Sequence, residues 1–494
     1  MTIDLPIIIT FGSYLVAMLV IGFFAYRMTN SLDDYVLGGR SLGPSVTALS
    51  VGASDMSGWL LLGLPGAIYA AGIGQVWIGV GLVAGAYLNW LLVAAPLRKA
   101  TELAGDAITI PEYLEYRFKD KSGLIRLTAA ILTLVFFTFY VGAGLVGGAI
   151  LFEKVFGLEY RAALFIGAGV IVSYTFIGGF LAVCWTDFVQ GCLMLVALVL
   201  LPVVALSELG GISETKAVLL DLDPGLLSPL SGMTSFGLAS LLAWGLGYFG
   251  QPHILVRFMA ISSPSAVPTA RRIAMGWMLV ALAGAAAVGL SGRAFYADTP
   301  LDNPETVFIL LNKALLNPWV AGVFIAAIMS AIMSTIDSQL LVCSSAITED
   351  LAKRGLKLKL SEKAYVWLGR ASVGVVAVVG LLLALDRDSQ VLQLVSYAWA
   401  GFGCAFGPVI ILSLYWRGIS RVGAIVSMLT GALVVIIWPL LSDWVAPSDG
   451  GLLSGVLGLY EMIPGFILAF AVAVLVSKAS PDADSSSRYE EITC

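Results

Sequence analysis

Apolar runs long enough to cross a bilayer recur along nearly the whole chain, and they constrain its fold more than any other feature. A helix of about 20 apolar residues spans the hydrocarbon core, whereas strands of an outer-membrane barrel give shorter, alternating segments. Only 12% of the residues are charged and the mean hydropathy is +0.94, which excludes a soluble globule. We therefore predict an all-α integral membrane protein.

Thirteen transmembrane helices are predicted from these runs. They cover residues 5–26, 44–72, 76–97, 124–152, 161–179, 185–206, 233–260, 272–290, 314–347, 366–385, 393–416, 422–440 and 455–477. The first run has an acidic leader and no small-residue cleavage site, so we expect a retained span and not a signal peptide.

Basic residues indicate the orientation. Most of the 27 Lys and Arg residues lie in loops on the same side as the predicted C-terminus. Basic loops resist translocation, so we expect a periplasmic N-terminus and a cytoplasmic C-terminus. The basic segments 98–126 and 353–370 are expected either to hold short helices at the membrane surface or to act only as topology signals.

The second predicted span carries polar residues at its centre. Ser54, Asp55, Ser57 and Gly58 fall there, and an ionised carboxylate at that depth costs at least a few kcal/mol unless it is paired or hydrated. Further glycines and a proline nearby predict that the helix unwinds, which frees carbonyls for a cation and N–H groups for an anion. The alternative is a polar kink that only packs against neighbouring helices.

The seventh span is predicted to be broken as well. It contains WGLGYFGQP, from Trp244 to Pro252, in which Trp244, Tyr248 and Gln251 are able to touch a ligand. Because this span follows the second by five, the two broken helices run in opposite directions, as in an inverted repeat with its site at the midplane. The alternative is that these glycines only allow close helix packing.

The inverted repeat sets the expected domains. They are a first helix with its loop, a first repeat, a second repeat, two peripheral spans and a flexible cytoplasmic tail, at residues 1–43, 44–206, 207–416, 417–479 and 480–494.

In the ninth predicted span, hydroxyl residues and one carboxylate interrupt an apolar sequence between Ser330 and Ser338. Ala331, Ser334 and Thr335 share one helix face because they lie three and four residues apart. Two hydroxyls with carbonyls from an unwound helix suit a monovalent cation. The alternative is that the hydroxyls bond back to their own helix.

Three long motifs resemble the sodium/solute symporter family: SVGASDMSGWLLLGLPGA, YTFIGGFLAVCWTDFVQG and AAIMSAIMSTIDSQLLVCSSAITEDL. The resemblance covers essentially the whole chain. It implies a LeuT-type fold of two inverted five-helix repeats, with helices 2 and 7 broken. It also implies sodium-driven uptake of L-proline across the bacterial cytoplasmic (inner) membrane.

The resemblance also implies an ion site. It places sodium at the carbonyls of Ala53 and Met56 and at Ala331, Ser334 and Thr335. It further implies ion-coupling roles for two carboxylates. Asp55, as an unpaired carboxylate, is expected to attract the ion, although it would alternatively hold the break in shape. Asp187 either assists ion release or acts as a helix N-cap.

For the solute, the resemblance implies Ser57, Gly58, Trp59, Tyr140, Trp244, Tyr248 and Pro252. Half-helix N–H groups suit a carboxylate, and aromatic rings offer a flat wall to a pyrrolidine ring. Arg40 is important in the family but equally fits a topology charge. His253, the single histidine, is expected to be a structural residue with satisfied hydrogen bonds.

The remaining expectations concern energy source, partners and rivals. No phosphate-binding loop is present, so an ion gradient is expected to drive transport, with no cofactor besides co-transported Na⁺. L-proline, Na⁺ and the bilayer are the expected partners, with no nucleic acid, transition metal or obligatory protein partner.

The alternatives are another solute, such as pantothenate, a sugar or another amino acid, and more distantly a channel or membrane sensor. An enzyme is not expected. The five cysteines are predicted to be free thiols.

Overall fold

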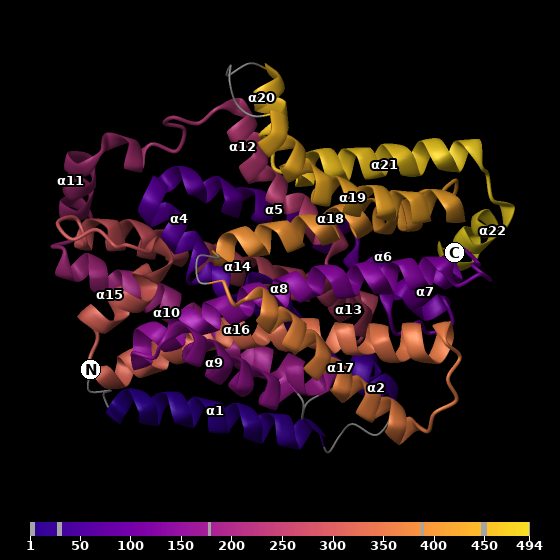
Figure 1. The fold of residues 1–494 in the computed structure, drawn as a ribbon, viewed down its shortest axis with the longest axis horizontal. Coiled ribbons are helices and arrows are strands. Elements are labelled where there is room, and N and C mark those ends of the chain that lie inside the picture. The colour runs from indigo at the N-terminus through magenta and orange to yellow at the C-terminus, as the bar shows by residue number, and fades with distance from the viewer. Residues whose placement is uncertain (1–4, 27–31, 176–178, 387–389, 446–451, 494) are drawn as a thin grey trace.

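The fold is a bundle of helices that run along one axis (Figure 1). The computed structural model describes residues 5–26, 32–175, 179–386, 390–445 and 452–493. We name the two ends of the bundle after short helices that lie there, the α4 end (α4, Gly63–Ala71) and the α7 end (α7, Ile110–Arg117). Among the described residues no strand is assigned; one isolated bridge joins Leu42 and Ile261. The all-α prediction is confirmed.

Ten helices of the described chain are long and apolar enough to cross a membrane. They are α1 (Leu5–Tyr26), α5 (Val76–Leu92) with α6 (Ala94–Leu103), α8 (Leu124–Phe156), α10 (Phe180–Glu208), α14 (Val267–Phe295), α16 (Pro318–Ser345), α17 (Glu362–Leu383), α18 (Val391–Tyr415), α19 (Arg421–Val445) and α21 (Met462–Ala479). The other three predicted spans correspond to α9 (Tyr160–Thr175) and two interrupted segments. The number of thirteen transmembrane spans therefore stays a prediction.

Several predicted boundaries are wrong by up to seven residues. The last span begins at Met462 and not at residue 455, because the chain turns between α20 (Leu452–Leu457) and α21; Gly458 follows α20 and Pro464 lies in the first turn of α21. The predicted end of the fifth span partly falls on residues 176–178, which lie outside the described residues.

The second predicted span is broken, as expected. It consists of α3 (Pro44–Met56), a 3₁₀ turn η2 (Gly58–Leu60) and α4. Between them Ser57 has φ 45° and ψ −170°. A non-glycine residue rarely adopts a positive φ, and no helix continues through such a residue. The alternative of a helix that is merely kinked is therefore wrong.

The seventh predicted span is broken in the same way. α12 (Ser235–Leu242) passes into a 3₁₀ segment η5 (Ala243–Gly250), and α13 (Pro252–Ala260) starts after it. The glycines of η5 also permit very close packing: a Cβ on Gly245 would lie 2.2 Å from the Gly81 carbonyl oxygen, and one on Gly247 would lie 1.9 Å from Trp399 Nε1. Here the break and the close packing occur together.

Gly247→Ala is therefore expected to displace Trp399 and destabilise the fold by about 1–3 kcal/mol, the usual cost of overpacking. Gly276→Ala in α14 is the matched control, since no atom lies within 4 Å of its added Cβ. Thermal melting in detergent measures the difference. Equal melting temperatures for the two variants would contradict the close packing of η5.

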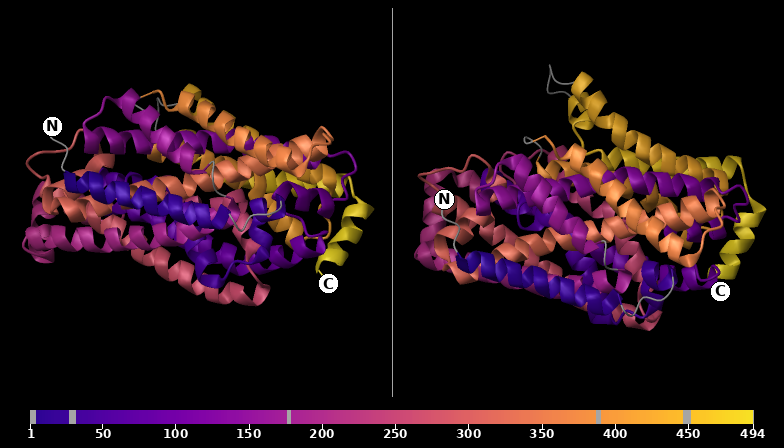
Figure 2. Two further views of the ribbon diagram at one scale, coloured as in Figure 1. Left: turned by 90° about the horizontal axis from the view of Figure 1, so that it is seen from below. Right: turned by 60° about the horizontal axis from the view of Figure 1, so that its bottom comes forward.

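The predicted flexible tail is wrong, because residues 483–493 form a helix, α22 (Ala483–Thr493). Figures 1 and 2 place this helix, in yellow, at the α7 end. Its charges are paired: Lys119 contacts Asp484 at 2.7 Å and Arg417 contacts Glu490 at 2.9 Å. Composition alone suggested disorder, but these tertiary partners order the segment.

Arg117 is the buried anchor of α22. Its Nη1 donates to the Ser485 carbonyl at 2.7 Å and its Nε donates to the Ser413 carbonyl at 2.9 Å. Its guanidinium also lies 5.1 Å from the centre of the Tyr489 ring. One side chain thus ties α7 to both α18 and α22.

Arg117→Met is expected to release α22 and to destabilise the fold by about 1–3 kcal/mol, because buried carbonyls lose their donor. Limited proteolysis of the last 15 residues and thermal melting measure the effect. The control is Arg161→Met, an exposed residue at the start of α9. Unchanged protection of the tail would contradict this anchor.

The first basic segment holds short helices, as one of the two expectations stated, whereas the second holds the end of a longer helix and the start of α17. The first contains α6 and α7, and the second begins in a π-helical extension of α16, η8 (Ala346–Gly355). Their charges do more than signal topology: the Arg126 side chain is 2% exposed and lies 3.1 Å from Glu112 and 3.5 Å from Asp350. The network joins α7, α8 and η8.

Candidate functional site

The two helix breaks meet in the middle of the bundle. The Tyr248 hydroxyl of η5 donates a hydrogen bond to Oδ2 of Asp55 near the end of α3. The Trp59 ring of η2 lies 6.0 Å from the Trp244 ring of η5, centre to centre. The breaks therefore form one local structure, as the inverted-repeat hypothesis requires.

A group of uncharged oxygens joins α3 to α16 beside this point. Ser334 Oγ donates to the Ala53 carbonyl at 2.8 Å, and Thr335 Oγ1 donates to the Ser54 carbonyl at 2.9 Å. Both hydroxyls also lie near the Ala331 carbonyl, at 3.3 and 3.2 Å. We call these three carbonyl oxygens and two hydroxyl oxygens the oxygen cluster. Hard cations bind such oxygens.

Four of the five residues predicted for sodium therefore come together in the oxygen cluster. The fifth, Met56, is the last residue of α3, and among the described residues no hydrogen bond joins it to the cluster; Ser54 supplies a carbonyl instead. The alternative that Ser334 and Thr335 bond only to their own helix is wrong, because both reach α3.

Asp55 is buried, and its carboxylate is paired, whereas we expected it to be unpaired. It accepts the Tyr248 hydroxyl, and its own carbonyl lies 3.5 Å from the Tyr140 hydroxyl. Asp55 thus links the two breaks to α8. This geometry favours the second predicted role, which is to hold the break in shape.

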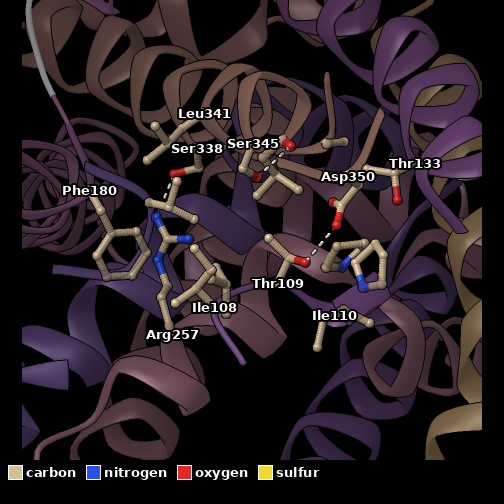
Figure 3. A pocket seen from close by; sticks show the side chains of 16 residues that line it. Ile108, Thr109, Ile110, Thr133, Phe180, Arg257, Ser338, Leu341, Ser345 and Asp350 are labelled. Atoms are coloured by element: carbon tan, nitrogen blue, oxygen red, sulfur yellow. Dashed lines mark hydrogen bonds between the residues drawn. The ribbon is translucent and has the colours of Figure 1, made fainter. Parts of the chain in front are cut away.

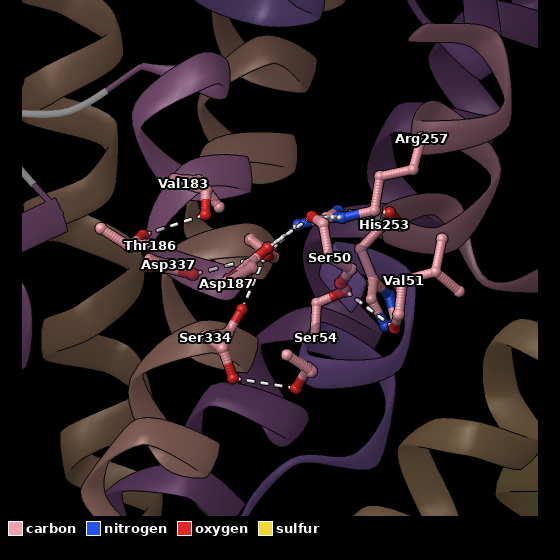
Figure 4. Close-up of polar contacts among 12 residues, drawn as sticks. Ser50, Val51, Ser54, Val183, Thr186, Asp187, His253, Arg257, Ser334 and Asp337 are labelled. Atoms are coloured by element: carbon pink, nitrogen blue, oxygen red, sulfur yellow. Dashed lines mark hydrogen bonds and ion pairs between the residues drawn. The ribbon is translucent and has the colours of Figure 1, made fainter. Parts of the chain in front are cut away.

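Asp187 belongs to a buried network with Arg257 (Figure 4). Arg257 Nη2 donates to Asp187 Oδ2 at 2.8 Å, and the Ser50 hydroxyl donates to the same oxygen at 2.6 Å. Since α10 begins at Phe180, Asp187 lies two turns inside the helix, and the N-cap interpretation is wrong. The network joins α3, α10 and α13, and Arg257 also donates to Ser338 of α16.

A central cavity lies next to the oxygen cluster, and a water-sized sphere can occupy only about 10 Å³ of it. That is room for about one water molecule, so the cavity has to widen to admit a solute. Its lining includes Ser57, Gly58, Tyr140, Ile332, Thr335 and Val391. Of the seven predicted solute residues, these three line it: Ser57, Gly58 and Tyr140.

The other predicted aromatic residues stand apart from this lining. The Trp244 ring packs between those of Trp59 and Tyr460, and the Tyr248 ring packs on Trp399. Trp399 Nε1 donates to the Trp244 carbonyl at 2.7 Å. Gln251, expected to be able to touch a ligand, instead donates to the carbonyls of Gly247 and Trp399. These side chains hold η5 against α18.

Pro252 lines a second cavity toward the α7 end, of which a water-sized sphere can occupy about 20 Å³ (Figure 3). Arg257 and Asp350 lie on different sides of this cavity, and Thr133 and Ser338 also line it. Pro252 starts α13, so it belongs to the half-helix on that side of the break. Pro252 thus lies at a different cavity from Ser57, Gly58 and Tyr140, and a common solute site for the seven residues stays a prediction.

Arg40 is more than a topology charge. Its side chain is 9% exposed and donates to Asp106 at 2.7 Å, to the Met259 carbonyl at 2.8 Å and to the Ala107 carbonyl at 2.9 Å. Burial lowers the pKa of the Arg40 guanidinium, while Asp106 acts in the opposite direction. Arg40 thus caps the last turn of α13 and fixes the loop before α7.

Two further predictions are settled by contacts. His253 is fully buried, but neither of its ring nitrogens has a hydrogen-bond partner among the described residues, which contradicts the expectation of a satisfied histidine. The four described cysteines are free thiols, as predicted, and Cys494 lies outside the described residues.

Sequence reasoning missed Arg257, Trp399 and Tyr460. Arg257 had a usable signal: it is a charge within a predicted span, and such charges are usually paired inside the bundle. Trp399 and Tyr460 carried none, because an aromatic residue in an apolar helix fits core packing equally well.

In this structure two opposed half-helices meet at a small buried cavity beside an oxygen cluster. This arrangement defines a membrane transporter built on broken helices. Solved structures share this fold. A substrate-bound, outward-open Na⁺-coupled sialic acid symporter matches with a TM-score of 0.80 and 19% identity, over 97% of this chain and 99% of that chain. Mhp1, a nucleobase-cation-symport-1 family transporter, matches with a TM-score of 0.57 and 14% identity, over 94% and 99% of the two chains.

Comparison of the sequence with known proteins narrows this class of transporters to one family. The sodium:solute symporter family model matches residues 35–431, and the chain belongs to that family. A sodium/proline symporter of Escherichia coli (strain K12) is 50% identical over 99% of this chain and 97% of its own length. A high-affinity proline transporter of Bacillus subtilis (strain 168) is 51% identical over 93% and 95%. The predicted family is confirmed, and the protein is a multi-pass inner-membrane transporter.

Proposed function

We propose that this protein carries L-proline together with sodium into the bacterial cytoplasm by alternating access. The observation that carries the proposal is the oxygen cluster, which joins the broken α3 to α16 beside the central cavity. The names of the relatives support the choice of ion and solute, since the relatives match the chain over nearly its whole length.

Sodium binds at the oxygen cluster in this proposal. The carbonyls of Ala53 and Ala331 and the hydroxyls of Ser334 and Thr335 are its ligands, with the Ser54 or Met56 carbonyl completing the set. In the present structure the hydroxyl protons bridge α16 to α3. A cation bound there takes over that bridge, so its binding fixes α3 against α16.

Proline binds in the central cavity. The backbone N–H of Gly58, at the start of the turn that follows Ser57, receives its carboxylate, whereas the N–H groups of Trp59 and Leu60 are bonded within the turn. Tyr140 and Ile332 bound the space for its ring. Asp55, Trp59, Trp244 and Tyr248 hold the two breaks in the shape that this pocket needs. Thr335 lines the cavity and belongs to the oxygen cluster, so ion and solute share one wall.

The α7 end is the cytoplasmic end in this proposal. It carries the basic segments of α6, α7 and η8, and basic segments stay on the cytoplasmic side. Residues 44–206 and 207–416 form the two inverted repeats around the site. The cavity lined by Pro252 and Arg257 then faces the cytoplasm and receives the released solute.

The energy available is sufficient for uptake. One charge crossing at 100 mV supplies about 2.3 kcal/mol, and a tenfold sodium gradient adds about 1.4 kcal/mol. With one sodium ion per solute, these terms sustain a solute gradient of about 500-fold.

The test is uptake of labelled proline into proteoliposomes of the purified protein, with an inward sodium gradient or with choline in its place. We expect uptake only with sodium, and counterflow into vesicles preloaded with unlabelled proline. Excess pantothenate or sugar is expected not to compete. Competition by one of these would assign another solute of the family, and uptake without counterflow would favour a channel.

A further inference from the structure

His253 is the one histidine of the chain, and its buried imidazole has no hydrogen-bond partner in the part of the chain that the structure describes. It follows Pro252 in the first turn of α13, directly after the break of η5. Its backbone carbonyl accepts a bond from Arg257 Nη1, so the backbone is held while the side chain is not. An unpaired polar group inside a protein is costly, so the ring is available to a partner from outside the described chain.

The ring lies between the two cavities. Its neighbours are the Phe137 ring at 5.6 Å and the Tyr140 ring at 6.2 Å, both on α8. On the same face of α8, Thr133 lines the cavity toward the α7 end and Tyr140 lines the central cavity. His253 and Phe137 thus form the layer that separates the cavities at α8.

The opposite wall of the path is α16. Thr335 lines the central cavity, and Ser338, one turn later, lines the cavity toward the α7 end. On α13, Pro252 and Arg257 line the same second cavity, and Figure 3 shows Arg257 at its edge. A solute that leaves the central cavity for the α7 end therefore passes α8, α13 and α16 at the level of His253.

We propose that His253 contacts the solute during release: its imidazole forms a hydrogen bond with the polar end of the solute as this moves from the central cavity to the cavity lined by Pro252. This inference rests on the proposed function, which makes the α7 end the side of release. The remainder of the layer is aromatic, with Phe137 packed on Phe402 at 4.2 Å. A zwitterion crossing an apolar layer loses its hydration, and a neutral imidazole offers both a donor and an acceptor in exchange.

The test compares two replacements of His253 that separate hydrogen bonding from ring packing. His253→Phe keeps a ring against Phe137 and Tyr140, whereas His253→Gln keeps a donor and an acceptor without the ring. We measure the maximal rate of sodium-driven proline uptake in proteoliposomes and the proline dissociation constant of the purified protein in sodium. Protein recovered in the membrane is measured for each variant.

For His253→Phe we expect the maximal rate to fall about tenfold, the effect of losing one hydrogen bond in a slow step, while the dissociation constant changes less than about twofold. For His253→Gln we expect most of the rate to remain. Should the Phe variant not be recovered, His253→Met serves as the apolar replacement with the same expected ranking.

Three outcomes would overturn the inference: an apolar variant that transports like the parent, a Gln variant that transports less than the Phe variant, and a dissociation constant that rises in step with the loss of rate. The first two would assign His253 to packing and the third to the resting site. Absence of sodium-driven proline uptake by the parent protein would instead overturn the proposed function itself.

Discussion

The double variant Ser334→Ala, Thr335→Ala is expected to raise the sodium concentration for half-maximal uptake by about 100-fold, the effect of losing two hydrogen-bond-strength contacts. Both hydroxyls belong to the oxygen cluster and both reach α3, so their removal takes two ligands from the ion and two bonds from the α3–α16 contact. Alanine is the best helix former, so α16 itself stays intact. Uptake at increasing sodium, with protein measured in the membrane, gives the result.

The matched control for this variant is Ser330→Ala, one turn earlier in α16. The Ser330 hydroxyl donates to the Ala326 carbonyl of its own helix at 2.8 Å, outside the oxygen cluster. We expect its sodium requirement to stay within about twofold of the parent. An unchanged sodium requirement in the double variant would remove α16 from the ion site.

Asp55→Asn is expected to lower sodium-driven uptake by about 100-fold or more, because the variant loses a buried charge beside the ion path and weakens the link between the two breaks. Tyr248→Phe removes only the hydroxyl that donates to Asp55, and we expect a loss of about tenfold. Initial rates of proline uptake measure both.

The double variant Asp55→Asn, Tyr248→Phe decides between the two roles of Asp55. If Asp55 works through its bond to Tyr248, the double variant is no worse than Asp55→Asn alone, because contacting residues are not additive. Fully additive losses would instead show that the carboxylate acts on the ion independently of Tyr248. Asp298→Asn, at an exposed loop carboxylate, is the control and is expected to leave uptake unchanged.

The ion and solute sites are coupled by geometry in this structure. Thr335 belongs both to the oxygen cluster and to the lining of the central cavity, and Asp55 lies between Tyr248 and Tyr140. A cation that tightens α3 against α16 therefore alters the same wall that the solute touches. The double variant Ser334→Ala, Thr335→Ala tests this connection at the ion site, and Asp55→Asn tests it at the helix breaks.

Much of the site was predictable because its signals are local. Ser57 and the glycines around it mark a break within one span, and Ala331, Ser334 and Thr335 mark one face of one helix. The first set disrupts helical hydrogen bonding wherever it occurs, and the second follows from helical periodicity.

Contacts between spans were not predictable in the same way. Asp55 was expected to be unpaired, yet it accepts the Tyr248 hydroxyl from a segment almost two hundred residues later. Asp187 fitted a helix N-cap until the true start of α10 placed it inside the helix, against Arg257. Pro252 looked equivalent to Tyr248 in sequence, but Pro252 starts α13 after the break and lines the cavity toward the α7 end, whereas Tyr248 lies within the break and bonds to Asp55.

By itself, then, the sequence determined an all-α membrane protein with two interrupted spans and a hydroxyl-bearing helix, since apolar length, polar breaks and helical periodicity are properties of each segment alone. Only the tertiary structure decided which polar side chains pair, how the site divides into two cavities, and that the C-terminal segment folds on Arg117. The physical reason is that a buried polar group must find its partner across helices, and the identity of that partner depends on how the helices pack.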